Sequence, residues 1–360
     1  MRASAEAAGV KRWLGRGALL AAIAFLVLTM INASWLAPDP IGGPKLIAHR
    51  GVAQIYYASG VGRDTCTATR IEEPVHDYLE NTARSMLKAQ QIGAQMVEID
   101  IAPTADGEIA VFHDWMLDCR TNGSGEVREA TLDELRALDI GYGYTADQGE
   151  SFPLRGSERQ QMPTLAEALE ALPRTPIMFN FKSADPAEAD LLAAKLRAAG
   201  REVEKLGDGF YGHPAPVARM ARLFPAAWTW STESARACSQ DYVLYGWTGY
   251  LPQSCRGGTM VVPLDDQWMF WGWPNRTLAR MQEHGGHIIV TGPREEGTPN
   301  QGLLLPEQFT QIPSTYSGHI WAEDIWTLGP ALRPSMDRRR PNEQQAAQAG
   351  LEQRRQRLAD

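Results

Sequence analysis

Residues 96–114 read "MVEIDIAPTADGEIAVFHD", and this stretch decides the fold. An apolar, β-prone run covers 96–104, an Asp-Gly pair follows, and 108–114 predicts a returning strand. Glu98 and Asp100 are two positions apart, so both carboxylates lie on one face of the first strand. The residues around them are apolar on both sides, which indicates that this face is not exposed to solvent.

Strand-like and helix-like segments alternate on either side of this stretch. Further strands are expected at 45–51, 176–183, 226–230, 258–264, 286–291 and 318–322, and helices at 81–94, 131–138, 164–172 and 186–200. The helices from 131 and 164 each open with threonine and carry glutamate three residues later, which is the capping-box spacing. Alternation of this kind predicts a parallel sheet, and the length of residues 45–335 suits a closed (β/α)8 TIM barrel.

The N-terminal region predicts a transmembrane helix ahead of the barrel. Residues 17–38 read "GALLAAIAFLVLTMINASWLAP" and carry no charge, and about 20 apolar residues suffice to cross a bilayer. Lys11, Arg12 and Arg16 precede the run, so the positive-inside rule places residues 1–16 in the cytoplasm. The expected location is the cytoplasmic membrane, single-pass, with the barrel on the periplasmic or extracytoplasmic side.

A cleaved signal peptide is the alternative for the same segment. Ile31 and Ala33 offer a weak cleavage site, but the run is longer than the usual apolar region of about 7–15 residues, which favours an uncleaved anchor.

The net charge limits the kinds of binding partner, and the positions of the cysteines indicate the cellular compartment. The 360 residues carry a formal net charge of −8, which argues against nucleic acid as a partner. All four cysteines, Cys66, Cys119, Cys238 and Cys255, follow the predicted anchor and would face an oxidising compartment. Disulfides are expected there, and the sequence alone allows three pairings.

Several motifs occur in a fixed order and are more specific together than singly. They are "HRG" (49–51), "ENT" (80–82), "VEIDIAPTADGEIAVFHDWMLD" (97–118), "TNGSGEV" (121–127), "TLDELRALDIG" (131–141) and "MPTLAEAL" (162–169). This pattern resembles the glycerophosphodiester phosphodiesterase family, strongly over residues 45–183 and weakly from 184 to 330. A final "GHIWAEDI" (318–325) looks like the last strand of that family.

The resemblance implies a TIM-barrel hydrolase with a divalent metal at the mouth of the barrel. His49 and His113 match the general acid/base pair of the family, and Arg50 matches its phosphate-binding arginine. Glu80 matches the glutamate of the ENT element, which supports the site. Lys182 matches the lysine that steadies phosphate charge.

The metal ligands implied by the resemblance are Glu98, Asp100 and Asn180. The family usually has glutamate where this chain has Asn180, two residues before Lys182. An amide oxygen can bind Ca²⁺ or Mg²⁺, but it brings no charge, so the protein ligands supply −2 instead of −3. Weaker metal binding, or a site completed by the substrate phosphate, is therefore expected.

Two further regions depart from the family pattern. Residues 52–78 form an insertion that leaves the end of a strand, and we expect it to cover the mouth as a lid. Since Cys66 and Cys119 then belong to the same rim, the hypothesis is that they pair, leaving Cys238 with Cys255. Nine Trp and Tyr residues crowd between 228 and 273 and indicate either core and rim packing or a platform for a lipid or choline-type headgroup.

The predicted function is metal-dependent hydrolysis of glycerophosphodiesters to glycerol 3-phosphate and an alcohol. One alternative is a phospholipase-type enzyme acting on phospholipids or lysophospholipids. The other is a weak or inactive protein that only binds a lipid or phosphodiester, because Asn180 replaces a charged ligand. Residues 337–360 are polar and rich in Gln and Arg, and are expected to be a disordered or partly helical tail.

Overall fold

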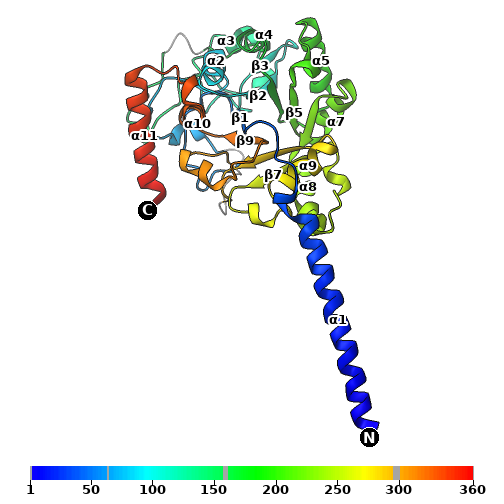
Figure 1. Cartoon of the computed structure of the whole chain (residues 1–360). Helices are drawn as coiled ribbons and strands as arrows, with labels where there is room; N and C mark the ends of the chain where they lie inside the picture. Colours follow the sequence, from blue (N-terminus) through cyan, green and yellow to red (C-terminus); the bar gives the residue numbers. More distant parts are fainter. Residues whose placement is uncertain (1, 63–64, 157–160, 295–300, 360) are drawn as a thin grey trace.

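Eight parallel strands form a nearly closed barrel in this computed structural model, which describes residues 2–62, 65–156, 161–294 and 301–359 (Figure 1). Their order is β6-β5-β4-β2-β1-β9-β8-β7, and β3 pairs antiparallel with the end of β2. The strands are β1 (Lys45–Ala48), β2 (Met96–Pro103), β3 (Ile109–Val111), β4 (Ile177–Phe181), β5 (Gly209–Gly212), β6 (Trp228–Ser231), β7 (Thr259–Pro263), β8 (His287–Thr291) and β9 (His319–Ala322). The predicted TIM barrel is confirmed.

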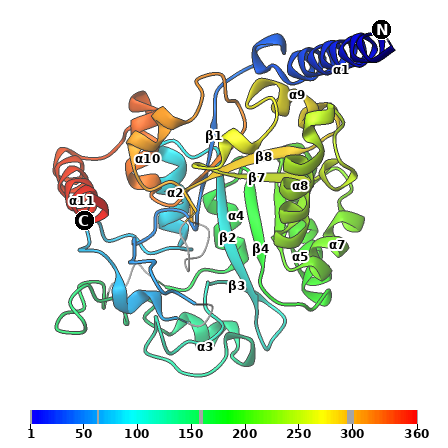
Figure 2. The same ribbon diagram turned by 90° about the horizontal axis from the view of Figure 1, so that it is seen from below.

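Helices surround the barrel strands (Figure 2). They are α2 (Ala83–Gln91), α3 (Leu132–Arg136), α4 (Leu165–Ala171), α5 (Ala187–Ala198), α6 (Val203–Leu206), α7 (Pro214–Leu223), α8 (Thr232–Tyr245), α9 (Asn275–Glu283) and α10 (Ile325–Leu332). Both predicted capping boxes are present, from Thr131 to Glu134 and from Thr164 to Glu167. Each box satisfies two of the backbone N–H groups at the helix start, so these short helices begin where the sequence indicates.

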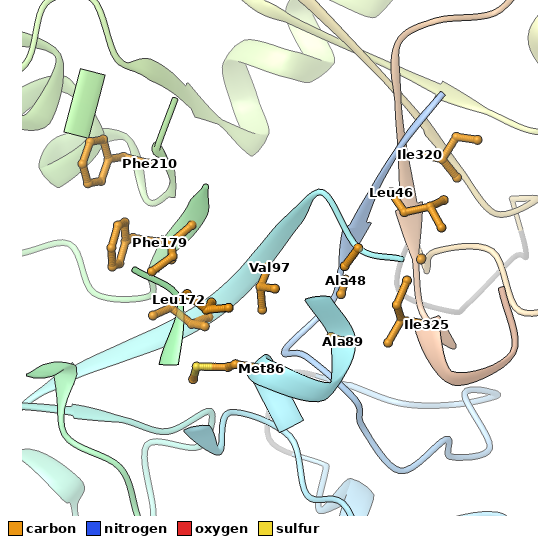
Figure 3. Packing of buried hydrophobic residues seen from close by; sticks show 14 of the residues in the cluster. Leu46, Ala48, Met86, Ala89, Val97, Leu172, Phe179, Phe210, Ile320 and Ile325 are labelled. Carbon is orange, nitrogen blue, oxygen red and sulfur yellow. The ribbon is translucent and has the colours of Figure 1, made fainter. Parts of the chain in front are cut away.

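The main core lies between the strands and the surrounding helices. Figure 3 shows Met86 and Ala89 of α2 packed toward Val97 of β2. Farther along the sheet, the rings of Phe179 and Phe210 stack with centroids 5.5 Å apart. The barrel has one seam, because no backbone pairing joins β6 to β7 in the described part of the chain. There Trp228 Nε1 donates a hydrogen bond to Thr259 Oγ1 at 2.8 Å and links the two strands.

The insertion at 52–78 packs into a second, smaller core, and its residues 63 and 64 lie outside the described residues. It contains η2 (Thr67–Arg70) and a short bridge between Tyr56 and Ile71. The disulfide from Cys66 to Cys119 joins the insertion to the segment that follows β3. A second disulfide joins Cys238 to Cys255, so both hypothesised pairings are confirmed.

The C-terminal segment takes the partly helical form of the tail that the sequence analysis expects. Residues Pro341–Ala359 form a helix, α11, on the opposite side of the barrel from α8 (Figures 1 and 2). Arg354 is buried and forms ion pairs with Glu72 at 2.9 Å and Asp324 at 2.5 Å. Ala347 and Leu351 are buried as well, so apolar packing and ion pairs to distant segments together hold this helix in place.

The first helix, α1 (Arg2–Asn32), extends away from the barrel (Figure 1). Its stretch Trp13–Asn32 has a mean hydropathy of 2.1 and is long and apolar enough to cross a membrane. The same length and composition also fit a signal sequence.

Candidate active site

The predicted site residues gather at the C-terminal ends of the barrel strands, the end at which TIM-barrel enzymes carry their active sites. His49 directly follows β1, and Glu98 and Asp100 lie on β2. Asn180 of β4 is the register partner of Asp100. The two strands therefore bring the amide and the carboxylate together, although 80 residues of sequence separate them.

Two turns with unusual backbone geometry meet beside these strands. Arg50 and Asn81 both have positive φ, 59° and 60°, and the Asn81 N–H donates to the Arg50 carbonyl at 2.8 Å. Gly51 also has positive φ, and a Cβ there would lie 2.7 Å from Ser85 Oγ. Non-glycine residues in this region cost about 1–3 kcal/mol each and cluster at functional sites. The HRG and ENT motifs are thus two halves of one structural unit.

Asp100 is fully buried and is the centre of the polar cluster. Its Oδ2 accepts from Asn81 Nδ2 at 2.8 Å, and its Oδ1 accepts from Asn180 Nδ2 at 2.8 Å. Arg50 Nε lies 3.3 Å and Lys182 Nζ 3.4 Å from the carboxylate. Burial opposes the charge, but these neighbours outweigh burial and lower the pKa of Asp100 far below its usual value.

Glu98 is also fully buried, but its neighbours stabilise its negative charge less than those of Asp100 do. It accepts hydrogen bonds from the Arg50 backbone N–H at 2.9 Å and from the Tyr211 hydroxyl at 2.7 Å. Burial and the adjacent Asp100 charge raise the pKa of Glu98 to about 7. The site therefore contains a carboxylate whose negative charge would be stabilised by an additional cation.

His49 sits beside a carboxylate that comes from the end of β9. Its Nδ1 lies 2.9 Å from Glu323 Oε1, and Glu323 Oε2 accepts the Gly302 backbone N–H at 3.0 Å. Burial disfavours a charged imidazole, but the Glu323 carboxylate more than compensates and the pKa of His49 is raised. This histidine is set to carry a proton.

At His113 the surroundings disfavour a protonated imidazole. Its Nδ1 lies 2.5 Å from Asp114 Oδ1, while its backbone carbonyl accepts from Lys182 Nζ at 2.6 Å. Burial, together with the positive charges of Arg50 and Lys182, lowers the pKa of His113 to about 3. Burial likewise lowers the pKa of Lys182 to about 8. His113 is therefore neutral at physiological pH, with Nδ1–H donating to Asp114 and Nε2 available as a base.

Glu80 does not touch the Asp100 cluster and lies behind His113. It forms an ion pair with Arg120, whose Nε donates to Asp114 Oδ2 at 2.8 Å. Arg120 also donates to the Tyr144 hydroxyl at 2.5 Å and to Thr67 Oγ1 at 2.7 Å. This buried guanidinium connects the ENT motif, the Asp114 carboxylate and the insertion.

Sequence reasoning missed several members of this arrangement. Arg120, Tyr211 and Asn81 were not singled out, and Glu323 was noted only as part of the last strand. The signal for Asn81 was present, because it lies inside the ENT motif. Arg120 and Tyr211 reach their partners from 40 and 113 residues away and belong to no local pattern.

An aromatic wall stands next to His49 and Glu98. Tyr211 stacks on Trp230 with ring centroids 4.8 Å apart, and both meet the ring of Trp321 edge-on. The ring of Trp321 lies 5.4 Å from the imidazole of His49. Part of the predicted aromatic crowd therefore lines the barrel interior at the site.

The residues present fit a cation held by two carboxylates better than one held by three. Glu98 and Asp100 offer hard oxygen ligands, and the raised pKa of Glu98 marks the place where a positive charge is lacking. Asn180 presents its NH₂ group to Asp100, so its oxygen becomes a ligand only when the amide turns over. Within the described ranges, no group of three or more His, Cys, Asp or Glu side chains is placed to hold a metal.

Sequence comparison relates part of the chain to a known protein family. Residues 74–206 match the sequence model of the Glycerophosphoryl diester phosphodiesterase family, a range that holds most of the cluster just described. Over this part of its length, the chain is similar to that family.

The family relatives match only parts of the chain. A glycerophosphodiester phosphodiesterase from Caldanaerobacter subterraneus is 37% identical over 93 residues, which cover 26% of this chain and 35% of that protein. The chain spans about a third to a half of the length of the curated relatives it matches.

Two solved structures show the same fold over most of the chain. A glycerophosphodiester phosphodiesterase from Agrobacterium tumefaciens superposes with a TM-score of 0.52 at 21% identity, over 80% of this chain and 99% of that one. An Oleispira antarctica phosphodiesterase, solved with the product sn-glycerol-3-phosphate, superposes with a TM-score of 0.50 at 18% identity, over 82% and 96%.

Proposed function

We propose that this chain is a phosphoric diester hydrolase that cleaves glycerophosphodiesters to glycerol 3-phosphate and an alcohol. The observation that carries the proposal is the histidine pair: His49 Nδ1 lies 2.9 Å from the Glu323 carboxylate and His113 Nδ1 lies 2.5 Å from that of Asp114. The surroundings raise the pKa of His49 and lower that of His113. Two titratable groups pushed apart in this way form an acid and a base that work at one pH. The product complex of the Oleispira antarctica protein supports the substrate class.

His113 accepts the proton of the attacking hydroxyl in this scheme. A hydroxyl of the glycerol moiety attacks phosphorus through oxygen, and His113 takes its proton while His49 protonates the departing alkoxide. The P–O bond to the alcohol breaks and a cyclic phosphate forms. Water then opens the cyclic phosphate, and the two histidines exchange roles and recover their starting protonation states.

Arg50 and Lys182 neutralise the phosphate during both steps. Both cations contact Asp100, which fixes their positions before substrate arrives. Stabilisation of developing charge by such preorganised groups is a large part of most rate enhancements.

A divalent cation, Ca²⁺ or Mg²⁺, would be held by Glu98 and Asp100 with the Asn180 amide oxygen. When bound, it would supply further neutralisation of the phosphoryl oxygens. Since the protein offers two carboxylates here, a substrate phosphate oxygen would complete the coordination.

Hydrolysis of a small panel of phosphodiesters tests the proposal. Purified full-length protein is assayed on glycerophosphocholine and on lysophosphatidylcholine with Ca²⁺, Mg²⁺ or EDTA. We expect release of glycerol 3-phosphate from glycerophosphocholine and its loss in His49→Ala, whereas His284→Ala, outside the site at the end of α9, stays active. Preference for lysophosphatidylcholine would identify the phospholipase-type activity. Equal rates for wild type and His49→Ala would remove the catalytic assignment.

We further infer that α1 stays on the mature protein as a single membrane-spanning anchor, with residues 1–16 in the cytoplasm. Arg280 is buried, and its guanidinium donates to the Ile31 carbonyl and to Asn32 Oδ1, each at 3.2 Å. Cleavage after Ala33 would remove both of these partners and leave the guanidinium only its contacts with the Tyr242 hydroxyl and the Gly246 carbonyl. The intact mass of the protein extracted from membranes distinguishes an anchor from a cleaved signal.

A further inference from the structure

Exposed aromatic and aliphatic side chains gather where α1 joins the barrel. Of the tryptophans beyond the candidate span, the four most exposed in the described residues are Trp35, Trp247, Trp268 and Trp271, with exposed fractions of 74%, 42%, 82% and 43%. Leu36, Ile41, Leu244, Tyr245 and Tyr250 are exposed in the same segments. We call these nine residues the exit surface.

The exit surface belongs to three neighbouring segments. They are residues 35–41 after α1, residues 244–250 at the end of α8 and in η4 (Gly246–Thr248), and residues 268–271 in and after η6 (Gln267–Met269). Trp271 Nε1 donates to the Val243 carbonyl at 3.0 Å, which joins the last two segments. A Cβ on Gly272 would lie 3.0 Å from the Asn32 carbonyl oxygen, so the third segment also touches the end of α1.

The end of α1 is fixed against this surface by polar contacts. Asn32 Nδ2 donates to the Trp247 carbonyl at 2.6 Å, and the buried Arg280 binds Ile31 and Asn32 as described above. Arg280 also donates to the Gly246 carbonyl at 3.1 Å. A cation at the C-terminal end of a helix is favoured by the helix dipole. The barrel is therefore attached directly at the end of the apolar span, without a flexible stalk.

This attachment decides what can cover the exit surface. If α1 crosses a bilayer, the membrane surface begins at Asn32, and the side chains beside Asn32 lie at the same depth. Tryptophan and tyrosine concentrate at the membrane–water interface, where one part of the ring is apolar and the other meets water. We infer that the exit surface lies in the interfacial layer of a phospholipid bilayer and holds the barrel against the membrane. This inference rests on the anchor proposed above and is independent of the proposed hydrolysis.

Tryptophan quenching by brominated lipid tests this placement. The full chain is reconstituted in phosphatidylcholine vesicles whose acyl chains are brominated near the headgroup, and its fluorescence is compared with that in unbrominated vesicles. Trp247→Phe, Trp268→Phe and Trp271→Phe are measured beside Trp115→Phe. Trp115 comes shortly after β3 in the sequence, and β3 lies on the far side of the barrel from α1 (Figures 1 and 2). Trp13, at the start of the candidate span, contributes equally to every sample.

We expect each exit-surface variant to lose part of the quenchable fluorescence, whereas Trp115→Phe loses none. The inference is overturned if the quenched fraction equals that of the wild type in all three variants. It is also overturned if the chain fails to float with the vesicles, or if crosslinks through residues 244–271 show that a second copy covers the surface. Since no turnover is needed, failure of the hydrolysis assay leaves this result unaffected.

Discussion

The two histidines of the site lie in regions with opposite electrostatic surroundings. His49 stands at the β1–β9 side and shares its Nδ1 with Glu323, a carboxylate from the end of the barrel sequence. His113 stands at the β3 side, where Asp114 is already bound by Arg120 and where Arg50 and Lys182 add positive charge. One region raises the pKa of its histidine and the other lowers it.

A carboxylate partner alone does not set the charge of a histidine. Both rings lie next to an acid, yet only Glu323 leaves enough negative potential to hold a proton on its neighbour. At His113 the Arg120 guanidinium takes up the charge of Asp114, so burial and the other two cations prevail. The acid and base assignments follow from these surroundings.

Removal of either imidazole ring is expected to have the largest effect on the rate. Loss of a general acid or base typically lowers the rate by about 10²–10⁴-fold, and we expect losses of this size in kcat for His49→Ala and for His113→Ala. Steady-state kinetics on glycerophosphocholine measures both. His284→Ala is the matched control, and a loss confined to one of the two catalytic variants would contradict the paired roles.

Arg120→Met removes the guanidinium that binds Glu80 and Asp114 beside β3 and leaves the His113 ring in place. The substitution leaves the buried Glu80 unpaired, and an unpaired buried partner of this kind costs about 3–5 kcal/mol in the free energy of unfolding. Denaturant unfolding of the full chain in detergent measures the change. The double variant Arg120→Met with Glu80→Gln restores part of the stability, because the isolated charge is gone. If single and double variants are equally unstable, the loss comes from packing.

The sequence predicts the motif-bearing half of the site far better than its partners. His49, Glu98, Asp100 and Lys182 lie in short patterns whose spacing fixes the strand face that carries them. Glu323 reaches His49 from 274 residues away, and only the closure of the barrel brings them together. Contacts that form only when the barrel closes leave no pattern in the nearby sequence. Their effect on the pKa values of the two histidines therefore cannot be predicted from the motifs.

In the fold, too, local sequence patterns predict some elements and miss others. The repeated β and α segments predicted the barrel, but β5 (Gly209–Gly212) was not expected, since its two terminal glycines interrupt any β-prone run. For the C-terminal tail the sequence allows a partly helical segment but does not indicate that it packs on the barrel. The packing of α11 involves buried apolar side chains and Arg354, which binds the distant residues Glu72 and Asp324, while the composition of the segment is that of a solvated tail.

Glu323→Gln removes only the charge that distinguishes the His49 region. Protonated His49 acts as the acid, so activity falls as pH rises through its pKa. Without the carboxylate that pKa drops, and we expect the alkaline limb of the kcat profile to move to lower pH.

Asp114→Asn is the matched change at His113. It lowers the rate by disturbing the tautomer, but the alkaline limb stays in place, since His113 is already neutral. A shifted limb in Asp114→Asn, or an unmoved one in Glu323→Gln, would reverse the assignment of acid and base.

Asn180→Glu changes the strand position that lies between the two histidine regions, and its expected effect is on cation affinity. A third carboxylate beside Glu98 and Asp100 raises the negative charge of the site, and affinity for hard cations rises with the charge of the ligands. We expect Ca²⁺ or Mg²⁺ to bind about tenfold more tightly than in the wild type, measured by titration calorimetry without substrate. Asn180→Ala is the control for loss of the amide contact to Asp100. Equal affinity in wild type and Asn180→Glu would mean that the side chain at position 180 does not contact the cation, and would remove it from the set of metal ligands.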